Sequence, residues 1–161
     1  GLASDKKVPG TGFPLARVML IGEGPGADEE SSGYPFVGRA GQLLTKALNE
    51  VGLERSRVYI SNIVKCRPPG NRQPTRTEVG ACRPWLLKEI ELISPKVIIA
   101  LGNTAYGFFG GEKITKNHGR VEQWEGIVLI PTYHPAYLLR QDSTKLFSEF
   151  CRDLSLYNNY M

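Results

Sequence analysis

The sequence is poor in cysteine and has no long apolar run, and each shortage excludes a class of protein. Three cysteines among 161 residues are an odd number, which argues against the disulfide framework of a small secreted protein. No apolar run reaches the roughly 18 residues that a membrane span needs, and no signal-peptide pattern is present. We therefore expect a cytoplasmic protein with no membrane partner. Because Gly1 is not a methionine, we also expect residues upstream.

The net charge is slightly positive, and the positions of the charged residues along the chain are more informative than the net charge. Lysine and arginine number 20 against 16 aspartates and glutamates, and this net charge of +4 suits a polyanionic partner without requiring one. The basic residues of one short region are Lys65, Arg67, Arg72, Arg76 and Arg83, and the acidic residues of an earlier loop are Asp28, Glu29 and Glu30. A basic rim beside an acidic pocket suits a phosphate-backbone ligand whose reacting centre develops positive charge. A solvated surface loop explains the same charges equally well.

Four apolar segments alternate with helical patterns and predict an α/β fold. The expected strands begin at Arg17, Val58, Val97 and Ile127, and the expected helices cover about 38–49, 75–93, 104–109 and 143–157. Strands that alternate with helices form a parallel sheet with helices on both sides. We therefore predict one domain over residues 1–161, a three-layer α/β/α fold with a central, mainly parallel sheet of four strands. An arm at 1–16, loops at 23–36 and 67–74, and an edge strand at 121–124 complete the prediction.

Polar side chains stand where the expected strands end. The first strand runs into Gly22-Glu23-Gly24-Pro25-Gly26, the second ends on Asn62 and the fourth ends on His134. Open α/β sheets bind ligands outside the carboxyl ends of their strands, so these side chains are expected to meet in one active-site crevice. The Gly-rich loop lacks both the full dinucleotide fingerprint and a phosphate-loop lysine, so a nucleotide-binding enzyme is the weaker alternative.

Each of these residues also has a purely structural interpretation. The amide of Asn62 matches the N3 and O4 edge of uracil and mismatches that of cytosine, but an asparagine can also close a turn. The ring of Phe36 could stack on a base or fill the core. Glu23 and Glu29 could both face the crevice, although a single carboxylate is more often a solvated loop residue or a helix cap.

Two further groups of residues also have both a functional and a structural interpretation. Leu138 and Leu139 could wedge a duplex open while Arg140 meets a phosphate, or the leucines could anchor the start of a helix. Cys66 and Cys82 flank the Pro-rich loop, but zinc and iron-sulfur clusters normally need four ligands. On the residues alone, buried thiols are the better interpretation.

Four motifs in this order resemble the family 4 uracil-DNA glycosylases, the iron-sulfur branch of that superfamily: Gly22–Gly26, Pro35–Leu44, Asn62–Pro69 and His134–Ala136. The resemblance covers nearly the whole chain. It implies a monofunctional DNA repair enzyme of the prokaryotic cytosol, a monomer that flips uracil out of single- or double-stranded DNA and hydrolyses its bond to deoxyribose. A catalytically silent DNA-binding or polymerase-associated module of the same fold is the alternative.

The resemblance also implies a role for each matching residue. Glu23 and His134 are expected to be catalytic, Glu23 by positioning water or countering the sugar cation and His134 by donating to uracil O2. The substrate is expected to contact Gly24, Glu29, Phe36 and Asn62, with Phe36 stacking on the base, Asn62 recognising its polar edge and Glu29 bordering C5, where thymine carries a methyl group. The residues expected to contact DNA are Arg67, Arg72, Leu138, Leu139 and Arg140.

A 4Fe-4S cluster follows from the resemblance alone. Cys66 and Cys82 match two of the four cysteines that hold it in the family, and the other two form a Cys-x-x-Cys expected just ahead of Gly1. Either this sequence is truncated or the cluster has been lost. The chemistry itself is expected to need no metal, and Ala136, where many members have serine, is a mild departure.

Overall fold

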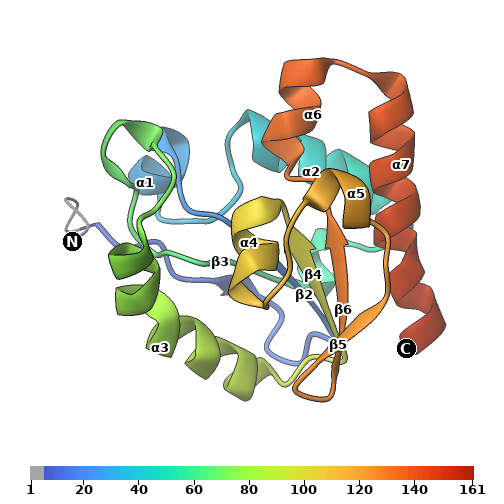
Figure 1. Ribbon diagram of the computed structural model, residues 1–161, viewed down its shortest axis with the longest axis horizontal. Coiled ribbons are helices and arrows are strands. Elements are labelled where there is room, and N and C mark those ends of the chain that lie inside the picture. The colour runs from blue at the N-terminus through green and yellow to red at the C-terminus, as the bar shows by residue number, and fades with distance from the viewer. Residues whose placement is uncertain (1–5) are drawn as a thin grey trace.

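A single mixed sheet organises the molecule. The computed structural model describes residues 6–161, and Figure 1 shows the sheet running between helices. Four parallel strands lie in the order β3 (Tyr59–Asn62), β2 (Val18–Gly22), β4 (Val97–Leu101) and β6 (Ile127–Thr132). Two short antiparallel strands flank them, β1 (Thr11–Gly12) beside β3 and β5 (Glu122–Trp124) beside β6. The parallel strands and the edge strand are confirmed, but the sheet has six strands rather than four.

Helices cover both faces of this sheet, so the predicted three layers are confirmed. The helices α2 (Arg39–Glu50), α6 (Pro135–Gln141) and α7 (Thr144–Ser155) pack on one face. On the other face lie α3 (Arg76–Ile93), α4 (Asn103–Phe108) and α5 (Ile114–Asn117). Every residue of β2 and β4 is buried, as expected of parallel strands covered on both sides. No helix among residues 6–161 is long and apolar enough to cross a membrane.

The register of the parallel strands brings their carboxyl ends to one edge. Gly22 pairs with Asn62 across β2 and β3, while Leu101 pairs with Thr132 across β4 and β6. The chain passes from β2 outward to β3 and then returns to β4 on the other side of β2. This change of direction makes a switch point, the place where open α/β sheets form a ligand crevice.

Besides α6, which the sequence offered only as one interpretation of Leu138 and Leu139, two short α-helices and one short strand were not predicted. A six-residue helix, α1 (Ala27–Ser32), lies inside the predicted loop 23–36 and has no buried residue, so it carries no apolar periodicity. The helix α5 has only four residues. Strand β1 lies within the predicted arm, whose first five residues are outside the described part of the chain. The arm is docked from Val8 on, because this buried residue donates its N–H to the carbonyl oxygen of Lys65 at 2.6 Å.

The start of α3 is held by a local hydrogen-bond motif. Thr75 is the N-cap, and its hydroxyl oxygen accepts the N–H of Glu78 at 3.2 Å. The carboxylate of Glu78 accepts the N–H of Thr75 in return at 2.8 Å, which completes a capping box. Strand β6 ends two residues earlier than expected, so His134 caps α6, while Asn103 begins α4 shortly after β4.

Candidate active site

A small cavity opens at the carboxyl ends of the parallel strands. Its volume is about 180 Å³, and its lining residues are Gly24, Gly26, Glu29, Phe36, Ala40, Asn62 and His134. Five of these seven were predicted from the sequence as substrate-binding or catalytic. The volume is well below the roughly 300–1,000 Å³ of sites for drug-sized ligands, so the cavity suits a single small ring. We call it the base pocket.

Asn62 contributes an unsatisfied polar atom to the base pocket. It ends β3 and is only 2% exposed, and its Oδ1 has no hydrogen-bond partner within the part of the chain that the structure describes. A buried acceptor without a partner is costly, and in native proteins it usually has a functional explanation. A ligand with an N–H directed at Oδ1 supplies the missing bond.

Phe36 faces Asn62 across Gly22, at the end of β2. A Cβ atom on Gly22 would overlap the Phe36 ring and lie 2.7 Å from Asn62 Oδ1, so only glycine allows these side chains to meet there. Phe36 itself is 5% exposed, and its φ of 53° is a conformation that non-glycine residues rarely adopt. Gly41 makes room for the strained residue, because a Cβ there would overlap the Phe36 backbone.

The carboxylate of Glu29 holds this strained loop in place. One oxygen accepts the N–H groups of Val37 at 2.9 Å and Gly38 at 2.8 Å, and the other accepts that of Gly26 at 2.9 Å. Partial burial acts to raise the pKa of Glu29, but these backbone hydrogen bonds outweigh it and leave the pKa below its ordinary value. Glu29 is therefore ionised at neutral pH. The carboxylate with which it borders the pocket already accepts hydrogen bonds from the backbone.

His134 enters the base pocket as a neutral ring with a defined proton. It is half-buried, and its Nδ1 accepts the N–H of Ala136 at 3.0 Å, which places the ring proton on Nε2. Burial, aided by the positive charge of Arg140 and opposed by Glu29, lowers the pKa of His134 to about 4. The ring centroids of His134 and Phe36 are 5.5 Å apart. His134 is thus a neutral hydrogen-bond donor at physiological pH.

Glu23 lines an adjoining groove rather than the base pocket itself. This groove has a volume of about 360 Å³, and its lining includes Glu23, Thr104, His134 and Arg140. His134 lies on the boundary, because it lines both the groove and the pocket. The hydroxyl of Thr104 donates to Glu23 Oε2 at 2.6 Å and fixes that carboxylate. The expected single crevice is therefore two adjoining spaces that share His134 in their lining. Thr104 was missed because a threonine near a helix start carries no distinctive pattern.

The residues expected to contact DNA have different surroundings. Arg140 is exposed at the rim of the groove. The guanidinium of Arg67 lies 3.9 Å from the carboxylate of Glu30. Arg72 pairs with both oxygens of Glu78, at 2.6 and 3.0 Å, so it already has a structural partner at the start of α3.

The two leucines expected to wedge the duplex open differ in exposure. Leu138 is 4% exposed and belongs to the hydrophobic core under α6. Leu139, one residue further along the same helix, is only partly buried. Successive residues of a helix point in different directions, so the two leucines cannot share one face. Only Leu139 has the accessibility that a wedge requires.

Comparison with known proteins identifies the family. A sequence model of the uracil DNA glycosylase superfamily matches residues 9–155. The chain belongs to this superfamily. The matched range spans all four parallel strands and every lining residue of the base pocket.

Similar proteins include two type-4 uracil-DNA glycosylases and a DNA polymerase. The chain is 53% identical over 143 residues to a type-4 uracil-DNA glycosylase of Thermotoga maritima, covering 86% of this chain and 74% of that protein. It is 44% identical over 160 residues to a type-4 uracil-DNA glycosylase of Pyrobaculum aerophilum, covering 93% and 81%. A DNA polymerase of Bacillus phage SP01 is 35% identical over 153 residues, which cover 94% of this chain but 16% of the polymerase.

The two cysteines implied by the family 4 resemblance lie together. Cys66 and Cys82 are both buried and line one cavity of about 650 Å³, next to Lys7 and Pro9 of the N-terminal arm. Cys151 is on α7, across the sheet, and cannot join them. Among residues 6–161 no three or more His, Cys, Asp or Glu side chains are grouped so that they could hold a metal ion. The residues present therefore fit two of the four ligands of a cluster.

Proposed function

We propose that this protein removes uracil from DNA by hydrolysing the bond between the base and its deoxyribose. The single observation that carries the proposal is the buried Oδ1 of Asn62, which has no hydrogen-bond partner in the described part of the chain and lies in a pocket sized for one ring. Uracil offers a donor at N3–H and an acceptor at O4, which suit the Oδ1 and Nδ2 of one amide. Cytosine has an acceptor at N3 and a donor at N4, so it would leave Oδ1 without its bond.

Entry of the base requires that it leave the DNA stack. Flipping a base costs a few kcal/mol. Stacking on the Phe36 ring returns about 1 to 3 kcal/mol. We propose that Leu139 fills the space left in the duplex and that Arg140, and with it Arg67, binds the phosphates beside the flipped nucleotide. A contribution from Arg72 requires that it contact phosphate while paired with Glu78.

The reaction separates charge, and the site has a group for each end. As the C1′–N1 bond breaks, the electron pair leaves with uracil and the sugar becomes positive. His134 Nε2–H stabilises the anion by donating to O2, and removal of one such donor typically costs about 2.7 to 4 kcal/mol of barrier. Glu23 orients a water whose oxygen bonds to C1′, and the proton released from this water neutralises the departing base.

Glu29 is proposed to shape the pocket in two ways. Its carboxylate fixes the loop that carries Phe36, and its side chain borders the position of C5. A methyl group at C5, as in thymine, would press against atoms that three hydrogen bonds hold still. Release of thymine from a matched duplex is therefore expected to be negligible.

A uracil-release assay on a uracil-containing oligonucleotide tests the proposal. Asn62→Ala and His134→Ala are expected to slow release by on the order of 100-fold or more. Asn49→Ala replaces an exposed asparagine on α2 and serves as the matched control, with unchanged release. Near-normal release by both pocket variants would remove the basis for these roles.

A 4Fe-4S cluster held by Cys66 and Cys82 forms a separate proposal. These thiolates would supply two ligands, and the other two would have to come from outside the 161 residues. When bound, such a cluster crosslinks chain segments, and no step of base removal passes through it. Iron and sulfide content of the purified full-length protein tests the proposal: Cys82→Ser should lose both, whereas Cys151→Ser should keep them.

We propose further that the 161 residues act as one monomeric domain in the cytosol of a prokaryote. The base pocket and the groove are complete within one chain. Size-exclusion chromatography tests the monomer, and cell fractionation tests the location. Because the pocket takes a flipped base, both single and double strands should be substrates, with single strands favoured since they require less unstacking.

The phage polymerase relative supports a second candidate function. Its similarity is confined to 16% of a DNA polymerase, so a domain of this fold can be part of a replication protein. A silent DNA-binding module would bind DNA with a steep salt dependence and release no base. The assay described above distinguishes the two functions directly.

A further inference from the structure

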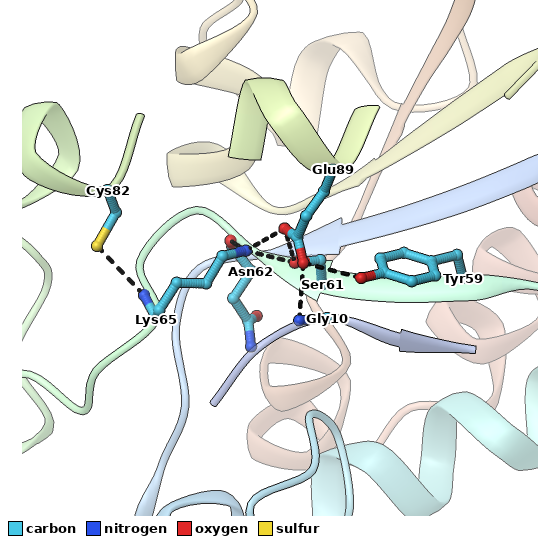
Figure 2. A network of polar contacts seen from close by, with 7 residues as sticks. All are labelled: Gly10, Tyr59, Ser61, Asn62, Lys65, Cys82 and Glu89. Carbon is cyan, nitrogen blue, oxygen red and sulfur yellow. Dashed lines mark hydrogen bonds and ion pairs between the residues drawn. The ribbon is translucent and has the colours of Figure 1, made fainter. Parts of the chain in front are cut away.

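A buried ion pair lies directly behind Asn62. Figure 2 shows Lys65, which follows β3, meeting Glu89 of α3 beside the N-terminal segment. The Nζ and Oε1 atoms are 2.5 Å apart, and the two side chains are only 7% and 15% exposed. Burying two charges is costly unless their geometry and remaining hydrogen bonds are satisfied. The pair therefore calls for an explanation beyond stability.

Each hydrogen atom of the Lys65 ammonium has a partner. Nζ donates to Ser61 Oγ, to Glu89 Oε1 and, at 2.8 Å, to the backbone carbonyl oxygen of Asn62. An ammonium has three donors, so none is left over. The backbone of Asn62 is thus tied to a buried charge.

Glu89 is saturated in the same way. Its Oε1 accepts from Ser61 as well as Lys65, and its Oε2 accepts the Tyr59 hydroxyl at 3.0 Å and the Gly10 N–H at 2.8 Å. A carboxylate has about four acceptor positions, and all are used. A buried network whose members are all satisfied adopts one arrangement and resists displacement.

The two ends of Asn62 are held differently. Its carbonyl belongs to this network, while its side chain points away from Lys65 (Figure 2) and lines the base pocket. Among residues 6–161 the amide oxygen has no hydrogen-bond partner to orient it. The orientation of the side-chain amide therefore depends on how firmly the backbone of Asn62 is fixed.

We propose that Lys65 and Glu89 are positioning residues that fix the backbone of Asn62 and so aim its amide at the base. This inference rests on the proposed glycosylase activity. A displacement of about 1 Å at a reacting site can cost on the order of 100-fold in rate. The hydrogen-bond network around Lys65 also reaches the cysteine cavity, because the backbone N–H of Lys65 donates to Cys82 Sγ at 3.4 Å. It thus links the cysteine cavity to the base pocket.

The neutral pair Lys65→Met/Glu89→Gln tests the proposal, because it removes both charges together and leaves neither buried alone. We expect kcat for uracil release to fall at least about tenfold while KM for DNA stays within about twofold, since the phosphate contacts lie elsewhere. Added to Asn62→Ala, the neutral pair should slow release by no more than about twofold further, because it acts through the residue already removed.

Tyr59→Phe is the matched control, since it removes a hydrogen bond to Glu89 on the oxygen that Lys65 does not touch. Its kcat should stay within about twofold of the wild type. If the neutral pair shows no cooperative melting transition, Ser61→Ala is tested in the same cycle, with the same expected non-additivity. Wild-type kcat in the neutral pair, or losses that multiply with Asn62→Ala, would overturn the inference. A wild-type protein that releases no uracil overturns the proposed function instead.

Discussion

Acid should destabilise this protein through His134. Burial, with Arg140 aiding and Glu29 opposing, lowers the pKa of the folded ring to about 4, against about 6.5 in an unfolded chain. Between these values the unfolded chain binds a proton that the folded chain excludes, so stability falls as the pH falls. The difference of about 2.5 units, at about 1.36 kcal/mol each, gives a loss of about 3 kcal/mol, complete below about pH 4.

The assay compares wild type with His134→Gln, which cannot be protonated. Urea unfolding followed by circular dichroism at several pH values between 7.5 and 4 gives the free energy of unfolding of each. Taking the difference between the two proteins removes the effect of all other titrating groups. The advantage of the wild type over the variant should shrink by about 3 kcal/mol across this range.

A second variant checks the cause. Arg140→Gln removes the positive charge that helps to lower the pKa of His134, so its own loss of stability in acid should be smaller than that of the wild type. Parallel pH profiles for wild type and His134→Gln would refute the reasoning. They would mean that the ring titrates alike in the folded and unfolded chains.

Three further predictions concern the surrounding structure. Thr104→Val, which frees the carboxylate of Glu23, should slow uracil release about tenfold with unchanged DNA affinity by fluorescence anisotropy. Gly41→Ala should lower stability by about 1 to 3 kcal/mol, because its methyl group would overlap the backbone of Phe36. Gly80→Ala, in open space on α3, is the control and should stabilise the protein slightly, as compared by thermal melting. Arg140→Gln should reduce the slope of log K against log salt for duplex DNA by about 0.9, and an unchanged slope would exclude a phosphate contact.

The parallel core of the fold was predictable because its signals are local. The strands β2 and β4 are runs of five buried residues, and their apolar composition marks them in the sequence. The cap of α3 at Thr75 is a local signal of the same kind, since the hydroxyl and the carboxylate lie three residues apart. By contrast, α1 has no buried residue and β1 is a Thr-Gly pair, so neither carries an apolar pattern.

The site was predictable where residues end strands. Asn62 and His134 follow apolar runs, and parallel register then brings them together. The separation of Glu23 into a neighbouring groove depends on a hydrogen bond to Thr104, eighty-one positions away, which no local pattern reveals. The ion pair of Lys65 with Glu89 is likewise a long-range contact. The burial of Leu138 follows from the rotation of a helix whose start was not fixed by the sequence.

The contact of Phe36 and Asn62 over Gly22 limits how base preference can change. At the end of β2, Gly22 has no side chain that could be trimmed to make space. A purine would therefore have to gain its room where Ala40 and the loop that Glu29 holds, which carries Phe36 itself, line the pocket. Variants selected for larger bases should accumulate substitutions in that loop and leave the strand ends untouched.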